Sequence, residues 1–181
     1  MENNCKKITP HPQFLDILFS FKGSVSRVFK DVIGIHQIHH FSLARINQHQ
    51  ELVALSSTPA IEFNLFNGPL WQYDRTYNPH WFNLCTQSTW QALYQPSRYD
   101  ELYYLKQSKL SYPIGISLAH KIGQNFMIYS LASNKSCTRT HDLFANRGED
   151  FYEIGQHCAN ELMPVFNYCD QLNSMGLAMS A

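Results

Sequence analysis

The chain has 181 residues, of which 14 are Lys or Arg and 14 are Asp or Glu, so its formal net charge is zero. This balance argues against nucleic-acid binding through overall positive charge, and the hydrophobic fraction of 44% argues against a disordered chain. Aromatic residues make up 14% of the chain, a surplus that could line a pocket as well as build a core.

The first third of the chain predicts a helical segment and then a strand hairpin. Apolar residues recur at steps of three and four over 12–33, which predicts one helix, or two short helices because Gly23 weakens the middle. Residues 35–47 and 51–57 alternate and predict two strands. The connection between them is short and polar, so an antiparallel hairpin is expected.

The rest of the chain predicts short helices, a second hairpin and closing helices, and 60–94 is irregular and aromatic. The expected elements are short helices over 60–66 and 80–93, a helix over 97–109, strands over 114–121 and 125–133, and one or two helices over 140–172. Residues 173–181 predict an unstructured, flexible tail.

Two hairpins with helices before and after them predict a sheet that is covered on both faces. The expected fold class is α+β, an α-β-α sandwich with a central antiparallel sheet, similar in shape to PAS and GAF sensor domains. We expect one domain over 12–172, with an N-terminal extension over 1–11. A sandwich of this kind leaves a cavity between the sheet and the irregular aromatic segment.

Five short stretches, taken in order, resemble one known family. They are His40-Phe41-Ser42-Leu43-Ala44-Arg45-Ile46, Ser56-Ser57-Thr58-Pro59, Leu84-Cys85-Thr86-Gln87-Ser88, Pro113-Ile114-Gly115-Ile116-Ser117-Leu118 and Tyr129-Ser130-Leu131-Ala132-Ser133. Their order and spacing resemble the N-terminal, autoinducer-binding domain of LuxR-type quorum-sensing transcriptional regulators. The resemblance covers 12–172.

The resemblance implies a site for a small-molecule signal, and the chain departs from the family at two positions of that site. Where the family has a Trp that binds the lactone carbonyl, this chain has Glu62. Where the family has an Asp that accepts the ligand amide N–H, it has Asn78. Ser130 falls where the family places a ligand-contacting hydroxyl, and Trp90 or Tyr94 falls near its second pocket Trp. A standard acyl-homoserine lactone is therefore not expected as the ligand.

Aromatic side chains supply the other candidate ligand-binding residues. Trp and Tyr combine a large apolar surface with one hydrogen-bond donor, which suits a ligand of mixed polarity. The candidates are Trp71, Tyr73, Tyr77, Trp90 and Tyr94. Ordinary core packing is the alternative for these rings. Exposure to solvent is the alternative for Glu62 and Ser130.

The sequence gives little support for a metal site or for a catalytic site. His36, His39 and His40 lie on a predicted strand, where His39 opposes the other two, and no nearby acid completes a ligand set. The five cysteines form no C-x-x-C pair, and a Cys85 nucleophile would need a positioned His that spacing cannot show. We expect no metal, no cofactor and no enzymatic activity.

The sequence thus predicts a cytoplasmic small-molecule sensor domain of a LuxR-type regulator, able to form a homodimer. No signal peptide or bilayer-spanning segment is apparent, and we expect no membrane contact and no direct nucleic-acid binding by this segment. The family's C-terminal helix-turn-helix is absent, which implies the sensor half of a longer chain or a single-domain relative. The alternative function is a dimerisation or protein-interaction module of the same fold with a vestigial pocket.

Overall fold

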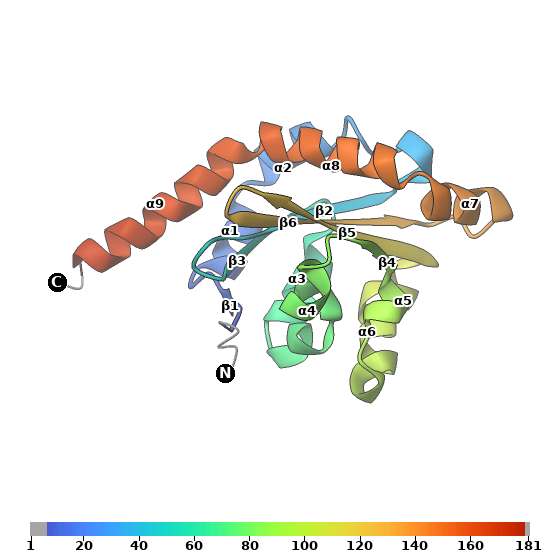
Figure 1. The fold of residues 1–181 in the computed structure, drawn as a ribbon, viewed down its shortest axis with the longest axis horizontal. Helices are drawn as coiled ribbons and strands as arrows, with labels where there is room; N and C mark the ends of the chain where they lie inside the picture. The colour runs from blue at the N-terminus through green and yellow to red at the C-terminus, as the bar shows by residue number, and fades with distance from the viewer. Residues whose placement is uncertain (1–6, 180–181) are drawn as a thin grey trace.

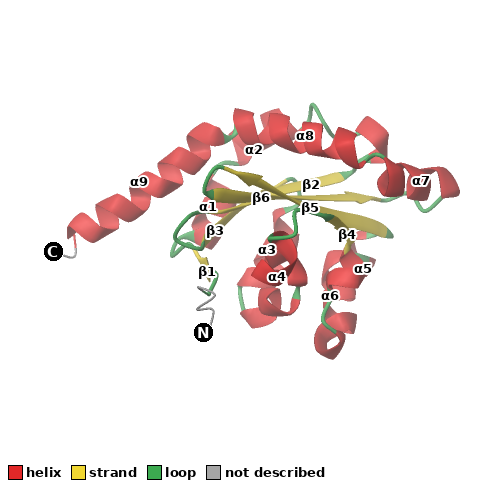
Figure 2. Cartoon of the chain, in the orientation of Figure 1, coloured by secondary structure: helices red, strands yellow, loops and turns green. Residues whose placement is uncertain are grey.

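The computed structural model describes residues 7–179, the last seven of them by their backbone alone. Within this part a mostly antiparallel sheet of six strands lies between two layers of helices (Figure 1). Helices α2 (Lys22–Phe29) and α8 (Gly148–Glu161) cover one face, and the short helices from α3 (Pro59–Phe66) to α6 (Tyr99–Lys106) lie against the other (Figure 2). The predicted α+β sandwich is confirmed.

The strand order across the sheet is β1-β3-β2-β6-β5-β4. The strands are β1 (Thr9–Pro10), β2 (His40–Ile46), β3 (Glu51–Ser56), β4 (Gln87–Thr89), β5 (Ile114–Ile122) and β6 (Asn125–Ser133). Hairpins β2–β3 and β5–β6 are both antiparallel, as predicted, and β2 pairs with β6 to join them. Strand β1 adds a short parallel edge beside β3.

The remaining α-helices are α1 (Phe14–Ser20), α4 (Pro79–Phe82), α5 (Trp90–Leu93), α7 (Thr138–Asn146) and α9 (Met163–Met179). Five 3-10 turns connect them within the described residues: η1 (Ile35–Gln37), η2 (Pro69–Tyr73), η3 (Arg75–Tyr77), η4 (Pro96–Arg98) and η5 (Ser108–Leu110). The segment between β3 and β5 is thus built from short pieces, and these pieces form the layer that faces the sheet.

The two faces of the sheet carry side chains of different size. Phe41, Leu43 and Tyr129 belong to the core that the sheet shares with α2, α8 and α9. Ala44 and Ala132 belong to the core that the sheet shares with α3–α6. Alternation along the strands therefore gives two buried faces, the first with large side chains and the second with small ones and a few larger apolar residues such as Ile128.

Two expectations for the N-terminal third differ from the structure. The segment 12–33 divides into α1 and α2 at Phe21 rather than at Gly23, which lets α1 pack on β3 while α2 packs on α8. The strand expected over 35–47 begins only at His40. Gly34, His36 and Gln37 have positive φ values of 98°, 48° and 67°, so the chain turns before the strand starts.

Further differences lie in short elements and at the C-terminal end. Part of the segment 80–93 forms β4, which pairs with β5, after Cys85 turns the chain at φ 51°. Thr9 and Pro10 of the expected N-terminal extension join the sheet. Residues 173–179 continue α9, so the unstructured tail predicted for them is wrong. Residues 1–6 of the extension and 180–181 of the tail lie outside the described residues.

Helix α9 starts against the sheet and then extends beyond it (Figure 1). Its first part is held by Arg45 of β2, whose Nη1 donates to Asp170 Oδ2 at 3.0 Å and whose guanidinium lies 5.0 Å from the Phe166 ring. Among residues 7–179, no helix combines the length and the apolar character that a membrane span requires.

Candidate functional site

A row of five serines crosses the sheet on the face toward α3–α6. Ser42 of β2 pairs with Ser56 of β3 and with Ser130 of β6, Ser130 pairs with Ser117 of β5, and Ser117 pairs with Ser88 of β4. Directly paired residues point to the same face, so their hydroxyls form one polar line. We call Ser56, Ser42, Ser130, Ser117 and Ser88 the serine row; all but the half-buried Ser88 are buried.

The middle of the serine row is covered by the ring of Trp90. Its Nε1 donates to Ser117 Oγ at 3.1 Å, and Ser117 Oγ lies 2.8 Å from Ser130 Oγ. The ring lies directly on Gly115, where a Cβ atom would come within 2.2 Å of it. Glycine at 115 is therefore what allows an indole to reach the sheet.

The other end of the row meets the carboxyl group of Glu62 on α3. This side chain is 2% exposed and lies close to Ser56 and Ser42, whose hydroxyls partly offset the effect of burial on its pKa. Burial raises the pKa of Glu62 to about 7, because an ionised carboxylate loses its hydration there. Its Oε2 atom is buried without a hydrogen-bond partner.

A buried ion pair lies in the layer of helices that faces the row. Lys106 Nζ on α6 donates to Asp74 Oδ2 at 2.6 Å, and both side chains are less than 5% exposed. The same ammonium lies 4.4 Å from the centre of the Trp90 ring and 5.3 Å from that of Tyr94. Asp74 Oδ1 also accepts from the Thr76 amide at 3.0 Å, which fixes the start of η3.

His40 at the start of β2 completes the set. Burial first, and the nearby positive charge of Lys106 second, lower the pKa of His40 to about 3, so the ring is neutral. Its Nδ1 lies 3.0 Å from Thr58 Oγ1, while Nε2 is buried without a partner. We refer to His40, Glu62, Asp74 and Lys106 as the buried polar cluster.

Tyr94 is hydrogen-bonded to Gln107, the residue that follows α6. Its hydroxyl donates to Gln107 Oε1 at 2.7 Å, and the amide of Gln107 in turn donates to the Tyr112 carbonyl at 3.1 Å. Burial raises the pKa of Tyr94, with the charge of Asp74 adding to the shift, so the hydroxyl stays protonated. The network fixes the orientation of the ring above the ion pair.

The structure brings four of the eight predicted site residues together. Ser130 belongs to the serine row and Glu62 to the buried polar cluster, and the rings of Trp90 and Tyr94 pack against them. Tyr77 is buried, and burial, with the charges of Glu62 and Asp74 adding to it, raises the pKa of its hydroxyl.

The other three predicted residues lie farther out. Trp71 and Asn78, with part of Tyr77, line an open hollow of about 310 Å³ beside Ile8. Asn78 Oδ1 accepts from the His80 amide at 2.9 Å and so caps α4. Tyr73 is half-buried, with the Arg98 guanidinium 5.1 Å from its ring. None of these three touches the serine row through a hydrogen bond within the described part of the chain.

Sequence reasoning missed most of the buried polar cluster. Lys106 follows the apolar stripe of its helix and carries no signal of burial, and Asp74 resembles a surface charge. Ser42 and Ser56 could have been found only from the strand register, which brings them opposite each other. Within residues 7–179 no group of three His, Cys, Asp or Glu side chains could hold a metal ion.

The chain was compared with known proteins. No protein-family model and no curated protein sequence matches it. The structure does match solved ones. CepR2 from Burkholderia cenocepacia, described as an N-acylhomoserine lactone dependent LuxR family transcription factor, matches with a TM-score of 0.55 at 12% identity, over 86% of this chain and 99% of that chain.

SdiA from Escherichia coli is also similar. One SdiA structure has a TM-score of 0.52 at 11% identity, over 78% of this chain and 61% of that chain. SdiA in complex with octanoyl-rac-glycerol has a TM-score of 0.51 at 12% identity, over 83% and 64%. This chain thus spans less than two thirds of either SdiA chain. At such low identities the structural match shows the fold alone. The chain has the fold of the autoinducer-binding domains of LuxR-type transcription regulators.

Proposed function

We propose that this chain is a small-molecule sensor domain whose ligand binds between the serine row and α3–α6. The observation that supports this most is the set of buried atoms that lack a hydrogen-bond partner. Of the five such side-chain atoms among the described residues, three lie on this side of the sheet: Glu62 Oε2, His40 Nε2 and Thr76 Oγ1. Unsatisfied buried groups are costly, and a polar ligand would satisfy them.

The chemistry of the site favours a ligand with both donors and acceptors. Glu62 has a pKa of about 7, so it can donate when protonated and accept when ionised. His40 is neutral and offers one more polar atom at Nε2. Trp90 and Tyr94 supply an apolar wall on which an acyl chain or a ring could pack.

A standard acyl-homoserine lactone fits this chemistry poorly. Glu62 stands where the family's indole would donate to the lactone carbonyl. Asn78 stands where its Asp would accept the amide N–H, and its side-chain oxygen already caps α4. Each lost buried hydrogen bond costs about 1–3 kcal/mol, so two of them weaken binding by a few orders of magnitude. Calorimetry with such lactones should show no submicromolar binding, and submicromolar binding of any one would contradict this specificity.

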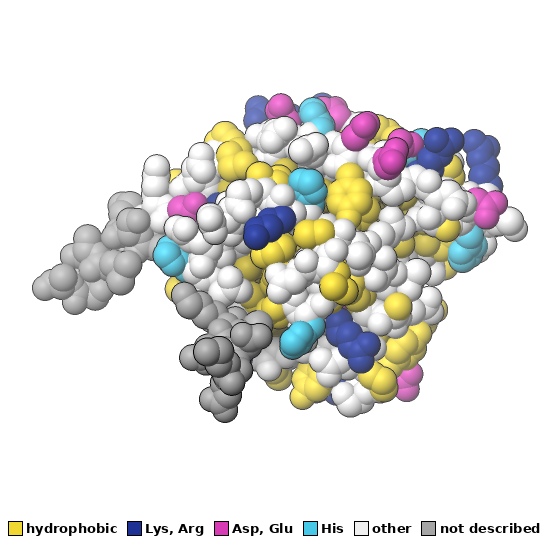
Figure 3. All heavy atoms as spheres, in the orientation of Figure 1, with side chains coloured by type: hydrophobic (Ala, Val, Ile, Leu, Met, Phe, Trp, Pro, Cys, Tyr) yellow, Lys and Arg dark blue, Asp and Glu magenta, His cyan; other side chains and the backbone are white. Residues whose placement is uncertain are grey.

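The wider role follows the proposed sensor function. We propose a cytoplasmic domain that acts by binding rather than by catalysis, forms a homodimer and does not itself contact DNA. On the face drawn in Figure 3, Lys and Arg side chains are scattered and mixed with acidic ones rather than gathered into one basic surface. This distribution agrees with the net charge of zero.

The second candidate function is a protein-interaction module with a vestigial pocket. It is favoured by the way the chain fills its own interior: Lys106 is already neutralised by Asp74, and Trp90 packs without a gap on Gly115. A thermal-shift screen of polar small molecules separates the two. A sensor should gain stability with a ligand, and Glu62→Gln should reduce that gain. No gain with any compound would favour the module.

A further inference from the structure

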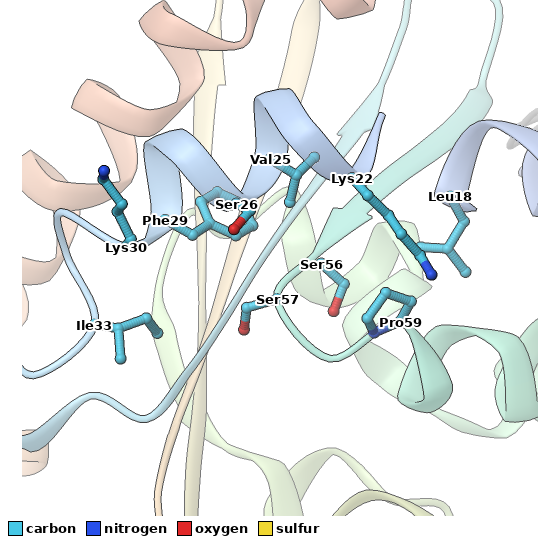
Figure 4. A pocket seen from close by; sticks show the side chains of 10 residues that line it. All are labelled: Leu18, Lys22, Val25, Ser26, Phe29, Lys30, Ile33, Ser56, Ser57 and Pro59. Atoms are coloured by element: carbon cyan, nitrogen blue, oxygen red, sulfur yellow. The ribbon is translucent and has the colours of Figure 1, made fainter. Parts of the chain in front are cut away.

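A second hollow lies outside the serine row, beside helix α2. It has a volume of about 540 Å³, and its walls come from α2, from the end of α1 and from the turn between β3 and α3 (Figure 4). Its apolar wall is made by Ile33, which is 36% exposed, with the nearly buried Val25 and Phe29 behind it, and Ser56 and Ser57 form its floor. Its size is within the range of small-molecule sites. We call it the α2 groove.

The groove lies beside the end of strand β3. Strand β1 pairs with β3 only at Glu51 and Leu52. Beyond these residues the edge of β3 continues to Ser56 with no described strand beside it, and α1 packs against β3. The groove lies between α2 and the end of this strand (Figure 4).

The charge of the α2 groove is entirely positive. Its lining includes Lys22 and Lys30 and no carboxylate. Asp31, which follows Lys30 in the sequence, lies toward Cys158 of α8, where its charge adds to the burial that raises the pKa of that thiol. No ion pair is formed by either lysine within residues 7–179, and the Lys22 ammonium is directed toward Pro59 at one end of the groove (Figure 4).

We propose that the α2 groove binds a free medium-chain carboxylate, with its carboxylate at Lys22 and its alkyl tail running past Val25 and Phe29 to Ile33. The apolar wall suits the tail, and an unpaired ammonium at one end suits the anion. Phe19, 40% exposed and 5.6 Å from Lys22 Nζ, extends the apolar surface at that end. This site shares Ser56 with the serine row but lies on the α2 side of it, and it does not depend on the sensor proposal.

Calorimetric titration of the full chain with decanoate tests the proposal. We expect saturable binding of one decanoate per chain. Lys22→Gln should weaken it about fivefold, as expected for a partly exposed ion pair. Lys109→Gln, which removes an exposed lysine outside the groove, should leave it unchanged. Hexanoate should bind at least tenfold more weakly than decanoate, because each buried methylene adds to the affinity.

A blocking variant and a charge-reversed probe make the test decisive. Ser26 is exposed and lines the groove, so Ser26→Trp should fill it and abolish binding without unfolding α2, which circular dichroism verifies. Decyltrimethylammonium should not bind. Binding that survives Ser26→Trp, or that is equal for the cation, would overturn the proposal. So would binding that is lost in Ser130→Val, since decanoate would then occupy the serine row.

Discussion

Both faces of the sheet are buried, but the strands present different side chains to them. Toward α2 and α8 the strands present large apolar side chains such as Phe41 and Leu43. Toward α3–α6 they present the serine row and Gly115, and the large rings come from the opposing helices. The first face is an apolar core, and the second is a core in which a line of hydroxyls crosses smaller apolar side chains.

On each face a glycine allows an aromatic ring to pack closely. The glycine belongs to a helix on the first face and to the sheet on the second. On the first face Gly155 belongs to helix α8, and a Cβ there would come within 2.3 Å of the Tyr129 ring on the sheet. On the second face Gly115 belongs to the sheet, and the ring is that of Trp90. The sheet thus supplies the large side chain on one face, and on the other it leaves the space that the Trp90 ring occupies.

The largest expected effect belongs to the apolar face. Phe41 is fully buried, with its ring centre 4.9 Å from that of Phe29. Phe41→Ala should lower the free energy of unfolding by about 3–5 kcal/mol, through lost transfer energy and the cavity it leaves. Urea unfolding measures this, with the exposed Leu84→Ala as control. A loss below about 1 kcal/mol would mean that this face does not specify the fold.

The next effect concerns the buried ion pair. Lys106→Met leaves Asp74 buried and unpaired, which should cost about 3 kcal/mol. Adding Asp74→Asn, which keeps the η3 cap, removes the uncompensated charge and should restore part of the loss. If the double variant is as unstable as the sum of the two single variants, the two groups do not interact.

A smaller effect should appear in the dependence of stability on pH. The pKa of Glu62 is raised to about 7, so between pH 4.5 and 6.5 the folded chain keeps a proton that the unfolded chain releases, and stability falls as pH rises. The pKa of His40 is lowered to about 3, so over the same range stability rises with pH. Each slope is about 1.4 kcal/mol per pH unit, and the two oppose each other.

Glu62→Gln removes only the first of these slopes. Between pH 4.5 and 6.5 the free energy of unfolding of the variant should rise with pH more steeply than that of the parent chain, by about 1.4 kcal/mol per pH unit. Urea unfolding at three pH values measures the slope, and the exposed Glu153→Gln should leave it unchanged. Equal slopes in Glu62→Gln and the parent chain would mean that Glu62 titrates as an exposed carboxyl group.

The smallest effect belongs to the serine row itself. Ser130→Ala removes one partner of the Ser117 hydroxyl and should cost about 1 kcal/mol. Thermal unfolding checks this loss. A loss as large as that of Phe41→Ala would show that the row is needed for folding, and the contrast between the two faces would then fail.

The sequence predicted the hairpins and the sandwich because strand alternation and helical periodicity are local patterns. It predicted Trp90, Tyr94, Ser130 and Glu62 at the site, partly through the family resemblance. It could not predict the serine row, because the pairing of the strands brings together residues as far apart in the sequence as Ser42 and Ser130.

Two other features of the structure could not be predicted from the sequence, for similar reasons. Strand β4 has three residues, too few to show a period, and exists because β5 offers a partner. Lys106 is buried by the partner Asp74, which lies 32 residues earlier in the chain. In both cases the deciding interaction is tertiary, and nothing in the local sequence indicates it.

Native mass spectrometry of the protein purified from its own host is the direct test of a ligand on the serine row. We expect a small molecule that is carried through purification, is released on unfolding, and is absent from Ser130→Val, whose extra methyl would occupy its place on the serine row. The exposed Ser97→Val should retain it. A parent chain that shows only its own mass, and that no polar small molecule stabilises, would contradict the sensor function.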